Sequence, residues 1–275
     1  MLSKLMLTLA LSAVFMFALN SALACTIFTA EGNGLLLAGN NEEHEDPNGE
    51  VRFEPASEGK YGKITFAFGP FTQGGMNEQG LFFDFWAPDA FKLPPWQQGQ
   101  LLPDGTVPDR QPTMDEMWQI CTQYDVASKQ MLEKCATVEE AIDFFQRHYE
   151  ASFGYAHIMV ADKSGASVEI TWDWDNNKLG VTRKAGSFQV IGIGRDTIFP
   201  RISSEGFEVS VESFRDLLES ASMDATAYSY ILDLKQGTVY VYNQRGYENP
   251  IQFSLETELA KGSRSFFLKD LFAKP

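Results

Sequence analysis

Hydrophobic and polar positions alternate along much of this chain with the period of two that is typical of half-buried β-strands. Residues 26–30, 51–55 and 64–68 follow this pattern, while residues 35–38 and 81–86 are apolar runs that fit buried strands. The Asn-Gly pair at positions 33 and 34 predicts a hairpin turn between the first two strands. Residues 71–75 are expected to form a loop, and residues 76–80 a tight turn.

The pattern becomes helical in the middle of the chain and then returns to strands. Helices are predicted at residues 114–124, 128–135, 137–149 and 213–220. Further strands are predicted at residues 156–162, 166–172, 188–193, 228–234 and 238–242. This order favours an α+β fold in which antiparallel sheets are covered by helices on their outer faces. The segment 88–112 is long enough to serve as a lid or a pocket wall.

An apolar leader precedes the first strand. Lys4 is followed by an unbroken apolar run over residues 5–19, and Ala22 and Ala24 supply the A-x-A pattern that signal peptidase reads. We therefore expect a signal peptide of residues 1–24 and a single mature domain of residues 25–275. The mature chain would begin with Cys25 and be periplasmic or secreted. Lipidation of Cys25 is the alternative, although that signal prefers leucine where Ala22 stands.

Composition and charge narrow the classes of partner. The chain has 275 residues, 44% of them hydrophobic and 13% aromatic, as in a globular protein. Its formal charge of −15 disfavours nucleic acid and anionic membranes as partners. After residue 24 no apolar stretch is long enough to span a membrane. A homo-oligomer remains open.

The cysteines and histidines predict no metal site. Cys121 and Cys135 could form a disulfide in an oxidising compartment, or they could be two buried thiols. Cys25 is then the unpaired cysteine. His44, His148 and His157 lack metal-ligand spacing, and no dinucleotide-binding glycine motif follows a strand. No cofactor is expected.

Several segments together resemble the choloylglycine hydrolase and penicillin V acylase family, which belongs to the N-terminal nucleophile (Ntn) hydrolases. The resemblance spans nearly all of the mature chain and rests on the order and spacing of its motifs. They are Cys25-Thr26, the hairpin into Gly39-Asn40-Asn41-Glu42-Glu43, the run Gly75-Met76-Asn77-Glu78-Gln79-Gly80-Leu81, and the segments 157–165 and 228–235. The resemblance implies an αββα sandwich of two stacked antiparallel sheets. It also implies cleavage of a non-peptide linear amide through an acyl-enzyme on the N-terminal cysteine.

The chain departs from the family pattern at three places. The family's Arg-Asn-x-Asp reads Asn40-Asn41-Glu42-Glu43 here, so the arginine that helps to set the ionisation of the cysteine is replaced. The family's oxyanion asparagine would fall near Ala87, and its later asparagine falls in the Gly192-Ile193-Gly194 region. These departures predict a divergent branch and keep a second hypothesis open, a binding protein on the same scaffold without chemistry.

The chemistry can also be argued from the residues themselves. An α-amino group titrates at roughly 7.7–8.0 and a cysteine near 8.5, so the amine of a mature Cys25 could take the proton of its own thiol. Glu43 is expected to orient that amine. Amide donors from Asn41 or Asn77, or nearby backbone N–H groups, are expected to stabilise the oxyanion. The alternatives are that both asparagines cap turns and that Glu43 is a surface acid. The substrate would be a small N-acyl amide.

Overall fold

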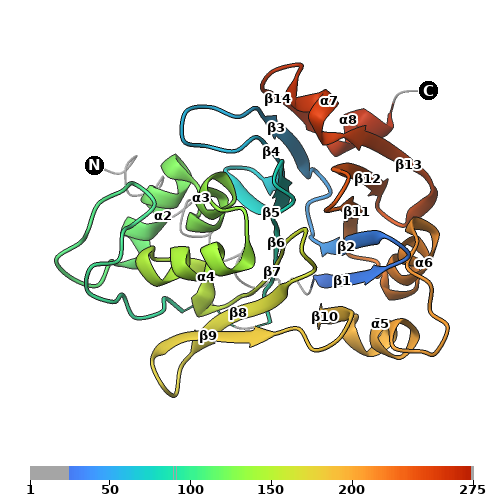
Figure 1. Cartoon of the computed structure of the whole chain (residues 1–275). Coiled ribbons are helices and arrows are strands. Elements are labelled where there is room, and N and C mark those ends of the chain that lie inside the picture. Colours follow the sequence, from blue (N-terminus) through green and yellow to red (C-terminus); the bar gives the residue numbers. More distant parts are fainter. Residues whose placement is uncertain (1–24, 89, 91, 274–275) are drawn as a thin grey trace.

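Two antiparallel β-sheets, stacked face to face, form the centre of the molecule (Figure 1). The computed structural model describes residues 25–88, 90 and 92–273, so the predicted signal peptide lies outside the described residues. The six-stranded sheet has the order β10-β1-β2-β11-β12-β13, and the eight-stranded sheet has the order β14-β3-β4-β5-β6-β7-β8-β9. The strands are β1 (Thr26–Gly32), β2 (Leu35–Glu43), β3 (Glu50–Glu54), β4 (Lys63–Phe68), β5 (Phe71–Asn77), β6 (Phe82–Trp86), β7 (His157–Ala161), β8 (Ser167–Asp173), β9 (Lys178–Arg183), β10 (Phe188–Gly192), β11 (Thr226–Asp233), β12 (Thr238–Asn243), β13 (Gly246–Ser254) and β14 (Arg264–Phe267).

Helices cover the outer faces of both sheets. They are α2 (Met114–Tyr124), α3 (Ala127–Lys134), α4 (Val138–Arg147), the 3-10 helix η1 (Ala151–Gly154), α5 (Arg195–Ile202), α6 (Val211–Ala221), α7 (Leu255–Leu259) and α8 (Leu268–Phe272). The apolar faces of α3 and α4 pack on β6–β8, and those of α5 and α6 pack on β1, β2 and β10. The predicted helix–sheet–sheet–helix sandwich is therefore confirmed. Within the described residues, no helix is long and apolar enough to cross a membrane.

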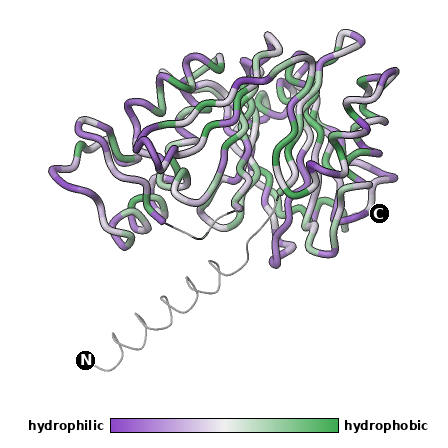
Figure 2. Tube along the Cα trace, turned by 90° about the horizontal axis from the view of Figure 1, so that it is seen from below, coloured by the Kyte–Doolittle hydropathy of each residue, from purple (hydrophilic) through white to green (hydrophobic). Residues whose placement is uncertain are grey.

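Alternation along each inner strand sends one set of side chains between the sheets and the other set toward the helices. Cys25, directly before β1, and Ile27 of β1 belong to the core between the sheets. Phe28 and Ala30 of the same strand belong to the core under α5 and α6. Figure 2 shows the hydrophobic stretches gathered along the strands and the hydrophilic stretches in the outer loops. This alternation decides which side chains can meet Cys25.

The strand β5 corrects the sequence prediction, which had a loop over residues 71–75. Its glycines have no side chains, so the sequence shows no alternation there. The same lack of side chains allows the strand to fit between its neighbours. A Cβ atom on Gly74 would lie 2.5 Å from Asp84 Oδ2, and one on Gly75 would overlap the backbone oxygen of Ile64. The two glycines let β4, β5 and β6 run close together.

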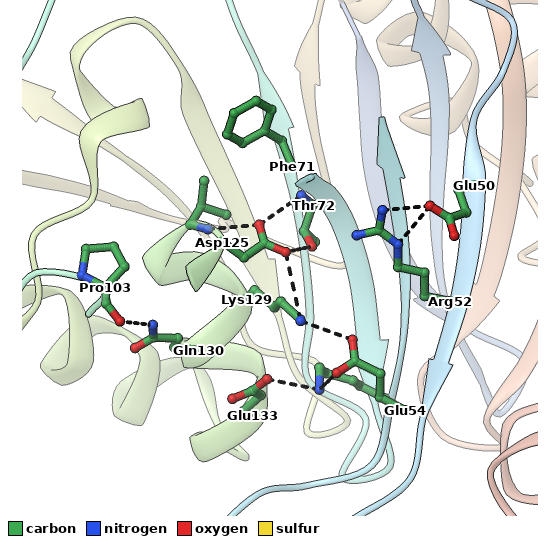
Figure 3. A network of polar contacts seen from close by, with 12 residues as sticks. Glu50, Arg52, Glu54, Phe71, Thr72, Pro103, Asp125, Lys129, Gln130 and Glu133 are labelled. Atoms are coloured by element: carbon green, nitrogen blue, oxygen red, sulfur yellow. Dashed lines mark hydrogen bonds and ion pairs between the residues drawn. The ribbon is translucent and has the colours of Figure 1, made fainter. Parts of the chain in front are cut away.

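A network of charged and polar side chains fixes α3 on the eight-stranded sheet (Figure 3). Lys63, with 3% of its side chain exposed, pairs with Glu54 at 3.0 Å and Glu133 at 3.1 Å. The Asp125 carboxylate accepts hydrogen bonds from the backbone N–H and the hydroxyl of Thr72. These interactions hold α3 in one position on the sheet. Removal of one partner of an ion pair would leave a charge without its counter-charge.

Candidate active site

Cys25 lies at the start of β1, between the two sheets, with 5% of its surface exposed. The neighbouring strand β10 holds its backbone, because the Ile193 N–H donates to the Cys25 carbonyl at 3.3 Å. Gly192 has φ of 100°, and a Cβ atom there would overlap that same carbonyl oxygen. The Gly194 N–H also donates to the Thr26 hydroxyl at 2.9 Å. Residues 192–194 thus fix the position of Cys25.

Asn40 and Glu42, on β2, share the inter-sheet face with Cys25. They continue the alternation of Leu36 and Ala38, which belong to the core between the sheets. Because Thr26 pairs with Asn41, Glu42 lies opposite Cys25, and its charge raises the pKa of the thiol. The Asn40 side-chain amide donates to Glu42 Oε2 at 3.1 Å. The residue that replaces the family's arginine therefore contacts a carboxyl group beside the cysteine.

The eight-stranded sheet contributes a second carboxyl group, Asp84 on β6. Asp84 is fully buried, and it accepts a hydrogen bond from the Tyr230 hydroxyl of β11 and one from the Phe85 N–H at 2.6 Å. The structure shows a hydrogen-bonded acid whose charge also reaches Cys25.

Burial and like charge raise the pKa values of this cluster. Burial raises the pKa of the Cys25 thiol well above its usual value, and the charges of Glu42, Glu43 and Asp84 raise it further. Burial raises the pKa of Glu42 to about 7 against the hydrogen bond from Asn40, and it raises the pKa of Glu43 to about 9. While Cys25 is peptide-bonded to Ala24, its thiol is therefore protonated at neutral pH.

The sequence predicted that Glu43 and Asn41 both act at Cys25, but the structure places their side chains against different partners. The charge of Glu43 raises the pKa of the Cys25 thiol, and its carboxyl group accepts a hydrogen bond from the Thr226 hydroxyl at 3.0 Å. Asn41 instead faces α6, where its amide donates to the Leu218 carbonyl at 2.9 Å and its oxygen accepts from Ser229 at 2.7 Å. The structure brings Glu43 to Cys25 but turns the Asn41 side chain away.

Asn77 also lies on a helix-covered face rather than between the sheets. Its amide donates to the carbonyls of Leu132 and Cys135, both at 2.8 Å. Its oxygen accepts from the N–H groups of Gln79 and Leu81, both at 3.0 Å. Both amide hydrogens are therefore used within the fold. This is the turn-capping alternative, and it leaves the amide no hydrogen for an oxyanion beside Cys25.

The other cysteines and the histidines lie outside the Cys25 cluster. Cys121 and Cys135 are separate buried thiols, which corresponds to the second of the two sequence alternatives. His157 Nδ1 lies 2.6 Å from Glu169, and His44 stacks on Phe68. No group of metal-ligating side chains occurs among the residues with described positions. A cavity of about 210 Å³ beside α2, lined by residues such as Leu102 and Ile120, includes no residue of the Cys25 cluster.

Sequence reasoning missed Glu42, Tyr228 and Tyr230 as members of the cluster. All three are buried on the inter-sheet face. The sequence did contain a signal for Glu42. If the first hairpin closes at positions 33 and 34, Cys25 lies opposite Glu42, and the two side chains are on the same face of the sheet. The tyrosines could not be placed in this way, because their strand is about 200 residues away in the sequence.

Searches of protein-family models and of curated protein sequences found no match. Among solved structures, the chain is similar to a cysteine-to-alanine mutant of conjugated bile acid hydrolase from Clostridium perfringens. That match has a TM-score of 0.62 and 14% identity over 88% of this chain and 96% of the other. The chain is also similar to penicillin V acylase from Agrobacterium tumefaciens, with a TM-score of 0.57 and 15% identity over 83% of this chain and 85% of the other. At these identities the similarity shows the fold, so the predicted Ntn-hydrolase fold is confirmed.

Proposed function

We propose that this protein is an exported cysteine amidohydrolase that cleaves a non-peptide linear amide through an acyl-enzyme on Cys25. The observation that carries the proposal is the place of Cys25, directly before β1 and directly after the A-x-A signal, buried between the sheets beside Glu42. The fold supports it, because conjugated bile acid hydrolase and penicillin V acylase share the fold.

Cleavage after Ala24 would supply the base. The amide nitrogen of Cys25 becomes an amine, which takes the thiol proton, and the thiolate then attacks the substrate carbonyl carbon. The carbon–nitrogen bond breaks as the ammonium returns a proton to the leaving nitrogen. Water then hydrolyses the thioester and regenerates the thiol. In this scheme Glu42 and Glu43 hold the positive charge of the amine while it carries the proton.

The two asparagines take a positioning role in this proposal. The bonds of Asn41 to Leu218 and Ser229 fix the end of β2, and with it the carboxyl groups of Glu42 and Glu43. The bonds of Asn77 fix the turn after β5 against α3. Neither amide donates to the reacting carbonyl.

The second candidate is a binding protein without chemistry, and Asn40 in place of the family's arginine is the observation that favours it. Lipidation of Cys25 is less well supported, because that signal prefers leucine at the position of Ala22.

The test compares processed wild-type protein with Cys25→Ala on a panel of N-acyl amides. The panel contains bile-salt conjugates, phenoxyacyl penicillins, acyl homoserine lactones and simple N-acyl amines. Intact mass first establishes that residues 1–24 have been removed. We expect Cys25→Ala to abolish turnover without lowering the melting temperature, while Cys121→Ala, as the matched control, keeps turnover. Hydrolysis by Cys25→Ala would refute the proposal, and a lack of turnover by the processed wild type would favour the binding protein.

A further inference from the structure

Four buried polar atoms around Cys25 have no hydrogen-bond partner among the described residues: Asn40 Oδ1, Glu43 Oε2, Trp86 Nε1 and the Tyr228 hydroxyl. Tyr228 is the fully buried donor of this set, with 0% of its surface exposed. A buried hydroxyl without a partner destabilises the fold. Such a group in a folded protein needs an explanation, and a bound ligand atom is one.

The Tyr228 side chain is held in one place. It stands on β11 opposite Glu42 of β2, and its ring stacks near Phe66 with centroids 5.6 Å apart. Gly49 closes the other side, since a Cβ atom there would lie 2.7 Å from Tyr228 Cε1. A hydroxyl on a fixed ring is preorganised, which is the property that electrostatic stabilisation of a transition state requires.

The surroundings keep Tyr228 as a hydrogen-bond donor. Burial raises the pKa of its phenol well above the usual value, and the charges of Glu42, Asp84 and Cys25 raise it further. Tyr228 lies opposite Glu42 in the register of β2 and β11, and it belongs to the same inter-sheet core as Cys25.

Other donors of the cluster already have acceptors. The Tyr230 hydroxyl donates to Asp84, and the Asn40 amide donates to Glu42. The amide of Asn77 is used on the helix-facing side of its sheet. Trp86 Nε1 is unpartnered, but its side chain comes from the opposite sheet and is only partly buried.

We propose that the Tyr228 hydroxyl donates a hydrogen bond to the oxyanion formed when Cys25 attacks the substrate carbonyl, in place of the asparagine that the family pattern leads one to expect near Ala87. This inference rests on the proposed function. As the sulfur–carbon bond forms, the carbonyl π electrons move to oxygen, and Tyr228 keeps its proton while it shares it with that oxygen. When the intermediate collapses, the electrons return and the carbon–nitrogen bond breaks.

The test is Tyr228→Phe in the processed enzyme, which keeps the ring and removes only the hydroxyl. We expect kcat to fall by about 10²–10³-fold, as after loss of one oxyanion donor. KM should change little, and the melting temperature should stay equal or rise, because the variant loses an unpartnered buried hydroxyl. A merely structural hydroxyl would not lower kcat while leaving stability intact.

Two control variants make the result specific. Tyr242→Phe, in the core under α5 and α6, should leave kcat unchanged. Tyr230→Phe should lower the melting temperature, since it removes the donor of Asp84. An unchanged kcat in Tyr228→Phe, or a fall in kcat together with a fall in melting temperature, would overturn the inference. Turnover by Cys25→Ala would instead refute the proposed function, so the two failures are distinguishable.

Discussion

Cys25, Glu42, Glu43 and Asp84 form a buried cluster in which all four groups have raised pKa values. Burial is the largest cause of the raised pKa in all four groups, and mutual repulsion adds to it for Cys25, Glu43 and Asp84. A new ammonium group on Cys25 would bring a positive charge into this cluster. Because opposite charge favours the ionised form, processing should lower the pKa values of the carboxyl groups and of the thiol.

Glu43 should make the stability of the uncleaved chain depend on pH. Its pKa is about 9 in the fold and near 4.5 when unfolded, so between these values the folded chain holds a proton that the unfolded chain has lost. The free energy of unfolding therefore decreases as pH rises from about 5 to 9. Cys25, Glu42 and Asp84 share this environment, and Thr226 is the hydrogen-bond partner of Glu43.

Glu43→Gln should flatten that pH dependence. We expect the variant to match the wild type at pH 5 and to melt several degrees higher at pH 9, measured by thermal unfolding of the uncleaved chain. The exposed Glu205→Gln variant is the control and should leave the profile unchanged. Parallel wild-type and Glu43→Gln curves from pH 5 to pH 9 would show that Glu43 does not carry the raised pKa.

At the scale of elements, the inner strands supply the cluster. β2 places Asn40 and Glu42 toward Cys25, and β11 places Tyr228 and Tyr230 toward the same space. The same strands place Asn41 and Ser229 toward α6. Residues adjacent in sequence therefore have separate tasks, one in the cluster and one in fixing the strand.

Asn77→Ala tests whether Asn77 serves the fold or the chemistry. Because it loses four hydrogen bonds, we expect a loss of about 2–4 kcal/mol of stability and a melting temperature lower by roughly 5–15 °C. kcat of the processed, folded variant should stay within about twofold of the wild type. Asn176→Ala in an exposed turn is the control. A loss of kcat above 100-fold at an unchanged melting temperature would instead make Asn77 an oxyanion donor.

The first hairpin and, apart from β5, the strands and α-helices as far as β8 could be predicted from the sequence, because alternation and the Asn33-Gly34 turn are local signals. The sequence prediction did not include β9, β13, β14, α5, α7 and α8. β5 could not be predicted, since Gly74 and Gly75 carry no side chain to alternate. For the site, the hairpin register places the end of β2 beside the start of β1, and the charge of Glu43 raises the pKa of the Cys25 thiol. Asn41 was misplaced because proximity at a strand end says nothing about the face of the sheet.

At the scale of the whole molecule, the cluster exists only where the two sheets meet. Asp84 comes from the eight-stranded sheet, and Cys25, Glu42 and Tyr230 come from the six-stranded sheet. Three carboxyl groups surround the thiol, and the family's arginine position holds Asn40. The chain as a whole carries a formal charge of −15. The carboxyl groups around Cys25 and the net negative charge of the chain therefore both disfavour binding of an anionic substrate.

We expect the processed enzyme to prefer uncharged amides to anionic ones. An N-acylglycine and the N-acylglycinamide of the same acyl chain differ in charge with little change in shape. kcat/KM for the amide should exceed that for the acid by about tenfold or more, a difference of about 1.4 kcal/mol. Steady-state kinetics on the pair measures this ratio. A higher kcat/KM for the N-acylglycine would show that a cation reaches the substrate at this site.

Removal of residues 1–24 should turn Cys25 into a nucleophile that becomes acylated during turnover. Intact-mass and peptide mass spectrometry of the processed protein, quenched with acid during turnover of an N-acyl amide, measures this acylation. We predict the mass of one acyl group on the peptide that begins with Cys25, and none on the uncleaved chain or on Cys25→Ala. Acylation of another residue, or equal acylation of the uncleaved chain, would contradict the account.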